Sequence, residues 1–257
     1  MGINVLQLTD IHLFADITQQ LKGINTEESL LHVLARITRE ERKPDIVLLT
    51  GDLAERGEAA AYQRLLQYAQ RFPCPVYAIP DNHDDLVVQE QTFVGSNISL
   101  QKSFIQGGWH FILLNSVIPQ HAEGKLSQSE LNFLQSALLR HAELPTLIAV
   151  HHHVQPVHGS MDAIMLRNAD AFLEVIAAFA NVRIVLCGHA HQVFDQTFSQ
   201  VRYLTAPSTC YQIKVGDAEF IADDKLAPGY RWLVLDDDGT IETEVVRVDL
   251  LTNSSIQ

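Results

Sequence analysis

The sequence contains few cysteines. Three of its 257 residues are cysteine, namely Cys74, Cys187 and Cys210, and none belongs to a Cys-x-x-Cys pair. Three thiols cannot all pair with one another, and zinc sites built on cysteine use closely spaced pairs. The cysteine content therefore argues against a disulfide-stabilised scaffold and against a cysteine-based zinc site.

Basic residues and long apolar runs are also scarce. The chain has 18 Lys and Arg against 31 Asp and Glu, which gives a formal charge of −13. Proteins that bind nucleic acid polymers neutralise phosphates with Lys and Arg, so we expect no such partner. No stretch approaches the ~18 apolar residues of a membrane-spanning helix, and the first residues lack the basic region of a signal peptide. We therefore expect no membrane partner and a cytoplasmic location.

No linker rich in Pro, Gly or Ser divides the chain. Apolar runs typical of buried strands alternate with segments of helical spacing, and short strands follow after residue 191. The expected strands are 3–8, 45–50, 76–79, 109–114, 146–150, 183–187, 193–198, 201–204, 231–235 and 240–248. Four helices are expected. The first begins with Thr26 as its N-cap, the second spans 58–71, the third follows the capping box at 127–130, and the fourth spans 169–180. This order favours one α/β domain over residues 1–257 with a largely parallel sheet, and residues 207–229 as an irregular insertion.

Histidine, in contrast, is abundant, with 12 residues. Imidazole is often a metal ligand or an acid–base group. Polar groups follow five of the expected strands, and these are Asp10 with His12, Asp52, Asn82 with His83, His151, and His189 with His191. Because ligands of open α/β sheets bind beyond the carboxyl ends of the strands, we expect these groups to meet at one rim of the sheet.

The chemistry of this set favours metal binding. Carboxylate, imidazole and amide oxygen without thiolate suit Fe, Mn or Zn. Seven such groups are too many for one four-coordinate ion, and they suit two divalent or trivalent ions ~3.5–4 Å apart that share one carboxylate. Asp52 is the natural bridge, because it follows Gly51 at a sharp turn in the middle of the set. The candidate metal ligands are Asp10, His12, Asp52, Asn82, His151, His189 and His191.

These motifs resemble a known signature. Asp10-x-His12, Gly51-Asp52, Asn82-His83-Asp84, His151 and Gly188-His189-Ala190-His191 are similar to the motifs of the calcineurin-like metallophosphoesterases. The segments around His151–His153, Arg167-Asn168, Pro207–Cys210 and Pro228–Trp232 resemble, more narrowly, the bacterial class III 3′,5′-cyclic AMP phosphodiesterases. The resemblance implies an α/β fold of two mixed β-sheets that form a sandwich flanked by helices.

The resemblance also implies a role for each residue. One ion would bind Asp10, His12, Asp52 and His191, and the other would bind Asp52, Asn82, His151 and His189. His83 and Asp52 would be catalytic, and His12, Asn82, His83 and His191 would lie at the substrate. The implied reaction is hydrolysis of 3′,5′-cyclic AMP to 5′-AMP by attack of a metal-bridging hydroxide. We expect His152 and His153 to lie beside the ligands or on the substrate side.

Asp81 departs from the resemblance, because the family usually has Gly before the Asn-His pair. We expect Asp81 in a turn where φ is positive, which Asp tolerates, and we expect its charge at the rim of the site. One alternative function is therefore a catalytically weakened sensor of metal or nucleotide. Another is hydrolysis of a different ester, such as a glycerophosphodiester, a 2′,3′-cyclic nucleotide or a phosphomonoester. We further expect residues 207–229 to lie near the site or to contact a second copy in a homodimer.

Overall fold

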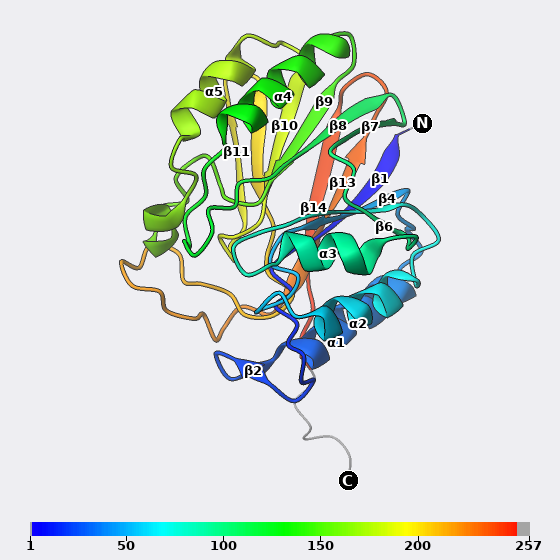
Figure 1. The fold of residues 1–257 in the computed structure, drawn as a ribbon, viewed down its shortest axis with the longest axis vertical. Coiled ribbons are helices and arrows are strands. Elements are labelled where there is room, and N and C mark those ends of the chain that lie inside the picture. The colour runs from blue at the N-terminus through cyan, green and yellow to red at the C-terminus, as the bar shows by residue number, and fades with distance from the viewer. Residues whose placement is uncertain (1, 251–257) are drawn as a thin grey trace.

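The computed structural model describes residues 2–250 and contains two six-stranded mixed sheets (Figure 1). The first sheet has the order β14-β13-β1-β4-β5-β6, and the second has the order β11-β12-β10-β9-β8-β7. The strands of the first sheet are β1 (Ile3–Leu8), β4 (Ile46–Thr50), β5 (Val76–Ile79), β6 (Ile98–Ser99), β13 (Gly229–Leu235) and β14 (Ile241–Arg247). Those of the second are β7 (Ser103–Gln106), β8 (Trp109–Leu114), β9 (Thr146–Val150), β10 (Val182–Cys187), β11 (Phe194–Phe198) and β12 (Val201–Thr205). The central strands β1, β4 and β5, and likewise β8, β9 and β10, run parallel.

The two sheets pack face to face, and helices cover their outer faces (Figure 1). Val5 and Leu48 of the first sheet share a buried core with Phe111, Leu147 and Ile184 of the second. The first sheet is covered by α1 (Thr26–Arg39), α2 (Ala59–Ala69) and α3 (Leu86–Phe93), and the second by α4 (Gln128–Arg140) and α5 (Ala169–Ala177). The remaining elements are the hairpin β2 (Gln20–Leu21) and β3 (Ile24–Asn25) and the 3₁₀ helix η1 (Ser160–Ile164). In residues 2–250, no helix is long and apolar enough to cross a membrane.

The fold class expected from the resemblance is confirmed, whereas the single, largely parallel sheet expected from the strand pattern is wrong. Central strands of both sheets are buried along their whole length, so hydropathy alone does not tell which sheet a strand joins. The N-cap of α1 is also Asn25, whose side chain accepts the Glu28 N–H at 3.0 Å, and not Thr26. The Thr26 hydroxyl instead donates to the carbonyl of His12 at 2.8 Å, and it thereby fixes α1 to the loop after β1.

Candidate metal centre

The polar strand ends of the two sheets meet face to face. The loops after β1, β4 and β5 of the first sheet provide Asp10, His12, Asp52, Asn82 and His83, and those after β9 and β10 of the second provide His151, His189 and His191. Asp10 crosses the junction, because its Oδ1 accepts the backbone N–H of His189 at 3.0 Å. The groups therefore do not share the rim of one sheet, as we expected, but lie between the rims of two.

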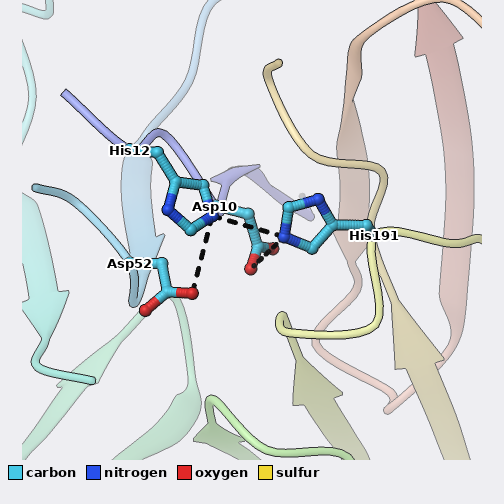
Figure 2. A group of neighbouring side chains, drawn as sticks. All are labelled: Asp10, His12, Asp52 and His191. Carbon is cyan, nitrogen blue, oxygen red and sulfur yellow. Dashed lines mark hydrogen bonds and ion pairs between the residues drawn. The ribbon is translucent and has the colours of Figure 1, made fainter. Parts of the chain in front are cut away.

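One group of donor atoms combines Asp10, His12, Asp52 and His191, all of them buried (Figure 2). Nε2 of His12 lies 3.6 Å from Oδ2 of Asp52 and 3.3 Å from Nε2 of His191. Nε2 of His191 lies 3.3 Å from Oδ1 of Asp10. Ligand atoms that share one metal ion lie at similar separations, because each is ~2.0–2.2 Å from the ion.

A second group of donor atoms contains Asp52, His151 and His189. Nε2 of His151 lies 3.5 Å from Oδ2 of Asp52 and 3.2 Å from Nδ1 of His189. Asp52 therefore belongs to both groups. In the loop after β5, Oδ1 of Asn82 is buried and has no hydrogen-bond partner. A buried amide oxygen without a donor is expected to be costly unless a cation or water occupies the space beside it.

Each of the four candidate imidazole ligands is oriented by a hydrogen bond from its other ring nitrogen. The acceptors are carbonyl or carboxylate oxygens, which cannot donate, so the bonded nitrogen carries a proton and the second nitrogen is directed to the neighbouring donor atoms. The bonds run from Nδ1 of His12 to Glu55 Oε2 (2.7 Å), Nδ1 of His151 to Thr50 O (2.7 Å), Nε2 of His189 to Ile164 O (3.1 Å) and Nδ1 of His191 to Tyr211 O (2.9 Å). This arrangement is typical of histidines that bind metals.

The electrostatics of the buried groups also suit cations. Burial raises the pKa of Asp52, but the imidazoles of His151 and His12 outweigh burial and hold its pKa well below the ordinary value. Burial, together with the neighbouring imidazoles of His152 and His151, holds the pKa of His189 well below its ordinary value. An ionised carboxylate and a neutral imidazole are the forms that bind metals. The donor set therefore fits two divalent ions that share Asp52.

The backbone at these donors adopts a conformation that non-glycine residues rarely take. The φ angles are 52° at Asp10, 53° at His12, 52° at Asp52, 64° at His189 and 49° at His191. Each such residue costs roughly 1–3 kcal/mol, so the surrounding structure must hold it in place. Among the holding bonds, the N–H groups of Asp10 and His12 donate to the carbonyls of residues 51 and 52 at 3.1 and 2.8 Å. Strain concentrated at five donors points to a functional site.

Gly51 allows the two sheets to approach at the centre. Its φ is 93°, and a Cβ atom there would lie 2.3 Å from Nδ1 of His151. Any side chain would therefore displace the imidazole that bonds to Thr50. The glycine before Asp52 is thus required both by its conformation and by the packing of His151.

Asp81 does not occupy the position that we expected. Its φ is not among the positive values of the described residues, and its side chain is fully buried instead of lying at the rim. Oδ1 of Asp81 lies 3.6 Å from Nε2 of His151, and Oδ2 lies 3.5 Å from Nδ1 of His152 without a hydrogen bond. Burial raises the pKa of Asp81 well above its ordinary value, and the nearby carboxylate of Asp52 adds to the rise. The carboxyl group of Asp81 therefore faces the interior of the centre.

His152 and His153 differ from the candidate ligands. Both ring nitrogens of His152 have protein partners, with Nδ1 2.8 Å from the Ser116 hydroxyl and Nε2 3.0 Å from the carbonyl of Ala122. No nitrogen of His152 is left for a metal. His153 is buried, its ring nitrogens have no hydrogen bond, and Nε2 lies 3.5 Å from Oδ1 of Asp162. Its ring stacks beside that of His189 at 5.9 Å.

Two carboxylates that organise the site were not assigned a role from the sequence. Oε2 of Glu55 lies 2.7 Å from Nδ1 of His12 and 3.3 Å from Nδ1 of His83, so it connects the two imidazoles. Asp84 accepts the N–H groups of Leu53 and Ala54 at 3.2 and 3.0 Å, and it thereby joins the loop after β5 to the loop after β4. The available signal was a carboxylate three residues after Asp52, but spacing alone does not show which way a loop side chain points.

The segment 207–229 contacts the centre. The Ser208 hydroxyl donates to the carbonyl of Asp10 at 2.8 Å, and the N–H of Thr209 donates to that of Thr9 at 3.2 Å. The ring of Tyr211 lies 4.3 Å from the ring of His191. These contacts explain how a distant part of the chain helps to hold the loop after β1. A contact between two copies through this segment stays a prediction.

Comparison with known proteins gives a consistent result. Residues 3–193 match the family model of the calcineurin-like phosphoesterases. A 3′,5′-cyclic adenosine monophosphate phosphodiesterase of Pseudomonas aeruginosa is 37% identical over 249 residues, 96% of this chain and 91% of that protein. A 3′,5′-cyclic-nucleotide phosphodiesterase of Nostoc sp. is 38% identical and covers 96% of this chain and 93% of its own. A dimetal phosphatase of Danio rerio shares the fold, with a TM-score of 0.67 and 15% identity over 96% of this chain and 99% of that one. The chain therefore belongs to the calcineurin-like phosphoesterase family.

Proposed function

We propose that the protein hydrolyses 3′,5′-cyclic AMP to 5′-AMP with two bound metal ions. The observation that carries the proposal is the pair of buried donor groups that share Asp52. The chemistry named for the relatives of Pseudomonas aeruginosa and Nostoc, which align over 96% of this chain, supports a cyclic nucleotide as the substrate. Fe, Mn or Zn would suit the donor atoms.

We assign the ligands of the two ions as follows. Asp10, His12, Asp52 and His191 would hold one ion, and Asp52, Asn82, His151 and His189 would hold the other. Bound ions would neutralise charge on the phosphate and lower the pKa of water toward ~7, which supplies a nucleophile at neutral pH. Asp52 would connect the two metal sites, because its carboxylate faces both His12 and His151.

His83 is our candidate for the group that assists the departing ribose oxygen. Burial lowers its pKa, but the carboxylates of Asp52 and Glu55 outweigh burial and raise the pKa above its ordinary value. The imidazole therefore retains a proton that it can donate. Its ring meets that of His12 edge to face at 5.0 Å, and its side chain is about a third exposed, so it reaches both the centre and solvent. We assign His12, Asn82, His83 and His191 as the residues that contact the phosphate.

The test is hydrolysis of a substrate panel by protein whose metal content is measured in the same sample. The panel contains 3′,5′-cyclic AMP, 2′,3′-cyclic AMP, a glycerophosphodiester and 5′-AMP as a phosphomonoester. We expect the highest kcat/KM for 3′,5′-cyclic AMP, loss of activity after chelation, and recovery with Mn²⁺. Faster turnover of another ester would replace the substrate, and nucleotide binding without turnover of any ester would make the protein a sensor. Activity that persists in protein free of metal would overturn the mechanism.

A further inference from the structure

A buried carboxylate outside the ligand set described above lies beside the second donor group. Asp81 is fully buried, and its Oδ2 has no hydrogen-bond partner. A buried, ionised carboxylate is costly unless a cation or several donors face it. The described residues supply one backbone donor, the N–H of Asn82, which bonds to Oδ1. The carboxylate of Asp81 therefore has fewer hydrogen-bond donors from the protein than a buried carboxylate requires.

Asp81 lies at a ligand-like distance from His151. Nε2 of His151 is surrounded by Nδ1 of His189 at 3.2 Å, Oδ2 of Asp52 at 3.5 Å and Oδ1 of Asp81 at 3.6 Å. Asp81 thus lies about as close to this nitrogen as Asp52 does. Two ligands on one ion, each ~2.1 Å away, are separated by ~3–3.6 Å when the angle between them is near 90–120°. The three neighbours of this nitrogen fall in or close to that range.

Among the described residues, the two histidines nearest to Asp81 lie 3.5–3.6 Å from its carboxylate and form no hydrogen bond with it. Nδ1 of His152, 3.5 Å from Oδ2, is already paired with the Ser116 hydroxyl at 2.8 Å. Nδ1 of His151 donates to the carbonyl of Thr50, so Nε2 is the ring nitrogen of His151 that faces Asp81. An ion bound to this nitrogen would therefore lie beside the carboxylate of Asp81.

We propose that Asp81 is an additional carboxylate ligand of the ion held by Asp52, Asn82, His151 and His189. This inference rests on the proposed two-metal function, and it extends the ligand set of that site by one anionic group. A second carboxylate at this ion strengthens its binding to hard cations, because oxygen ligands with negative charge favour them. Each ion would then have two carboxylate ligands, and the ion beside His151 would have one ligand more than the other.

The experiment compares metal binding by the native chain and by the variants Asp81→Asn and Asp81→Gly. Metal-free protein is titrated with Mn²⁺ in a calorimeter, and Co²⁺-loaded protein is examined by visible absorption, which reports the coordination of each ion. We expect two Mn²⁺ per native chain. We expect one of the two dissociation constants to rise by about tenfold or more in both variants, with the other unchanged. The Co²⁺ spectrum should change for the same single ion in Asp81→Gly.

A matched control separates a ligand from a general charge effect. Asp224→Asn removes one exposed negative charge from the same chain, and we expect native affinities for both ions. Equal affinities in native protein and both Asp81 variants would overturn the assignment. So would a lower affinity without any change in the Co²⁺ spectrum, because Asp81 would then act only through its charge. If native protein bound fewer than two ions, the proposed two-metal function itself would fail. Thermal unfolding shows whether each Asp81 variant is folded. If one of the two does not fold, the metal affinity and Co²⁺ spectrum of the other test the assignment.

Discussion

The two sheets bring different chemistry to the same junction. The first sheet contributes the carboxylates Asp10 and Asp52, and Asp81 adds a third buried one. The loops of the second sheet contribute imidazoles alone, from His151, His189 and His191. Both sets are buried, so neither rim can rely on water to solvate its polar groups. The buried polar groups of each rim therefore require partners from the other rim. A cation between the rims would bind the carboxylates of the first and the imidazoles of the second.

The pKa values reflect this division. In the first sheet, the pKa of Asp52 is held well below its ordinary value mainly by His151, which belongs to the second sheet and outweighs the effect of burial. In the second sheet, burial and the neighbouring histidines hold the pKa of His189 well below its ordinary value. Asp52 thus stays ionised because imidazoles face it, while the imidazole of His189 stays neutral. Changes at the shared carboxylate should therefore affect both rims, whereas changes at either rim should have narrower effects.

The largest effect is expected for Asp52→Asn, which removes the charge that both donor groups share. We expect kcat/KM for 3′,5′-cyclic AMP to fall by about 10³ or more, with loss of bound metal, because the amide is a weaker ligand at both sites. Hydrolysis and elemental analysis of one sample test this. Asp45→Asn, at the opposite end of β4, is the control and should behave as native. Full metal content in Asp52→Asn would show that the rims do not depend on a shared carboxylate.

A smaller and purely kinetic effect is expected for His83→Asn. His83 belongs to the first sheet, but it contacts Glu55 instead of the donor groups on the second sheet. We expect kcat to fall by about 10²–10⁴, as for loss of a positioned acid, while both metals remain bound. Rate measurements at saturating substrate together with metal analysis check this. Metal loss in the variant would place His83 among the ligands and would make the first rim less different from the second.

Much of this division was visible in the sequence, because Asp, Asn and His follow apolar runs at five separate places. The short elements β6, β7 and α3 were not predicted, and the split into two sheets was predicted by the family resemblance but not by the strand pattern. β8 and β9 are as apolar as β1 and β4, and only the core that Val5 and Phe111 share shows that the two sheets face each other. The hydrophobic periodicity of a strand indicates whether it is buried, but it does not indicate which other element packs against it.

At the site, the sequence indicated which side chains gather but not how they are oriented. The acceptors for His151, His189 and His191 are backbone carbonyls, and any residue can provide a carbonyl at those positions. Glu55 could have been noticed from its spacing, yet spacing does not predict the loop conformation, with a positive φ at Asp52, in which Glu55 contacts both His12 and His83. Asp81 was noticed as a departure from the family motif, but its burial was not foreseen, since a turn residue is usually exposed.

Glu55→Gln is expected to have an intermediate effect confined to the first rim. The amide still accepts a hydrogen bond from His12, so metal should remain bound, while kcat/KM falls by about 10–100-fold. The carboxylate of Glu55 contributes to the raised pKa of His83, so its loss lowers that pKa. The protonated acid then disappears at lower pH, and the decline of kcat on the alkaline side should begin earlier than in native protein. A pH–rate profile that does not move would mean that Glu55 does not act through His83.

The smallest effect is expected for Tyr62→Phe, which tests how the loops of the acidic rim are held. The Tyr62 hydroxyl donates to Oδ1 of Asp84 at 2.8 Å and accepts the N–H of Asp85 at 2.9 Å. Its loss should reduce the free energy of unfolding of metal-free protein by roughly 1–3 kcal/mol, because buried partners lose their hydrogen bonds. Urea denaturation measures the change. Tyr77→Phe, on β5 of the same sheet, is the control and should stay near native stability because Tyr77 mainly stacks on Phe104.

The pH dependence of the stability loss in Tyr62→Phe shows whether the contact of the hydroxyl with Asp84 causes it. Burial, with the charge of Asp52, raises the pKa of Asp84 to about 6, whereas Asp in an unfolded chain has its ordinary pKa near 3.8. The folded protein therefore binds the additional proton as pH falls through about 6, and ionised Asp84 destabilises it above that pH. The Tyr62 hydroxyl opposes this by stabilising the ionised form. The loss of stability in Tyr62→Phe should therefore be larger at pH 8 than at pH 5. An equal loss at both values would mean that the hydroxyl acts through Asp85 alone, and that the charge on the acidic rim is balanced by other groups.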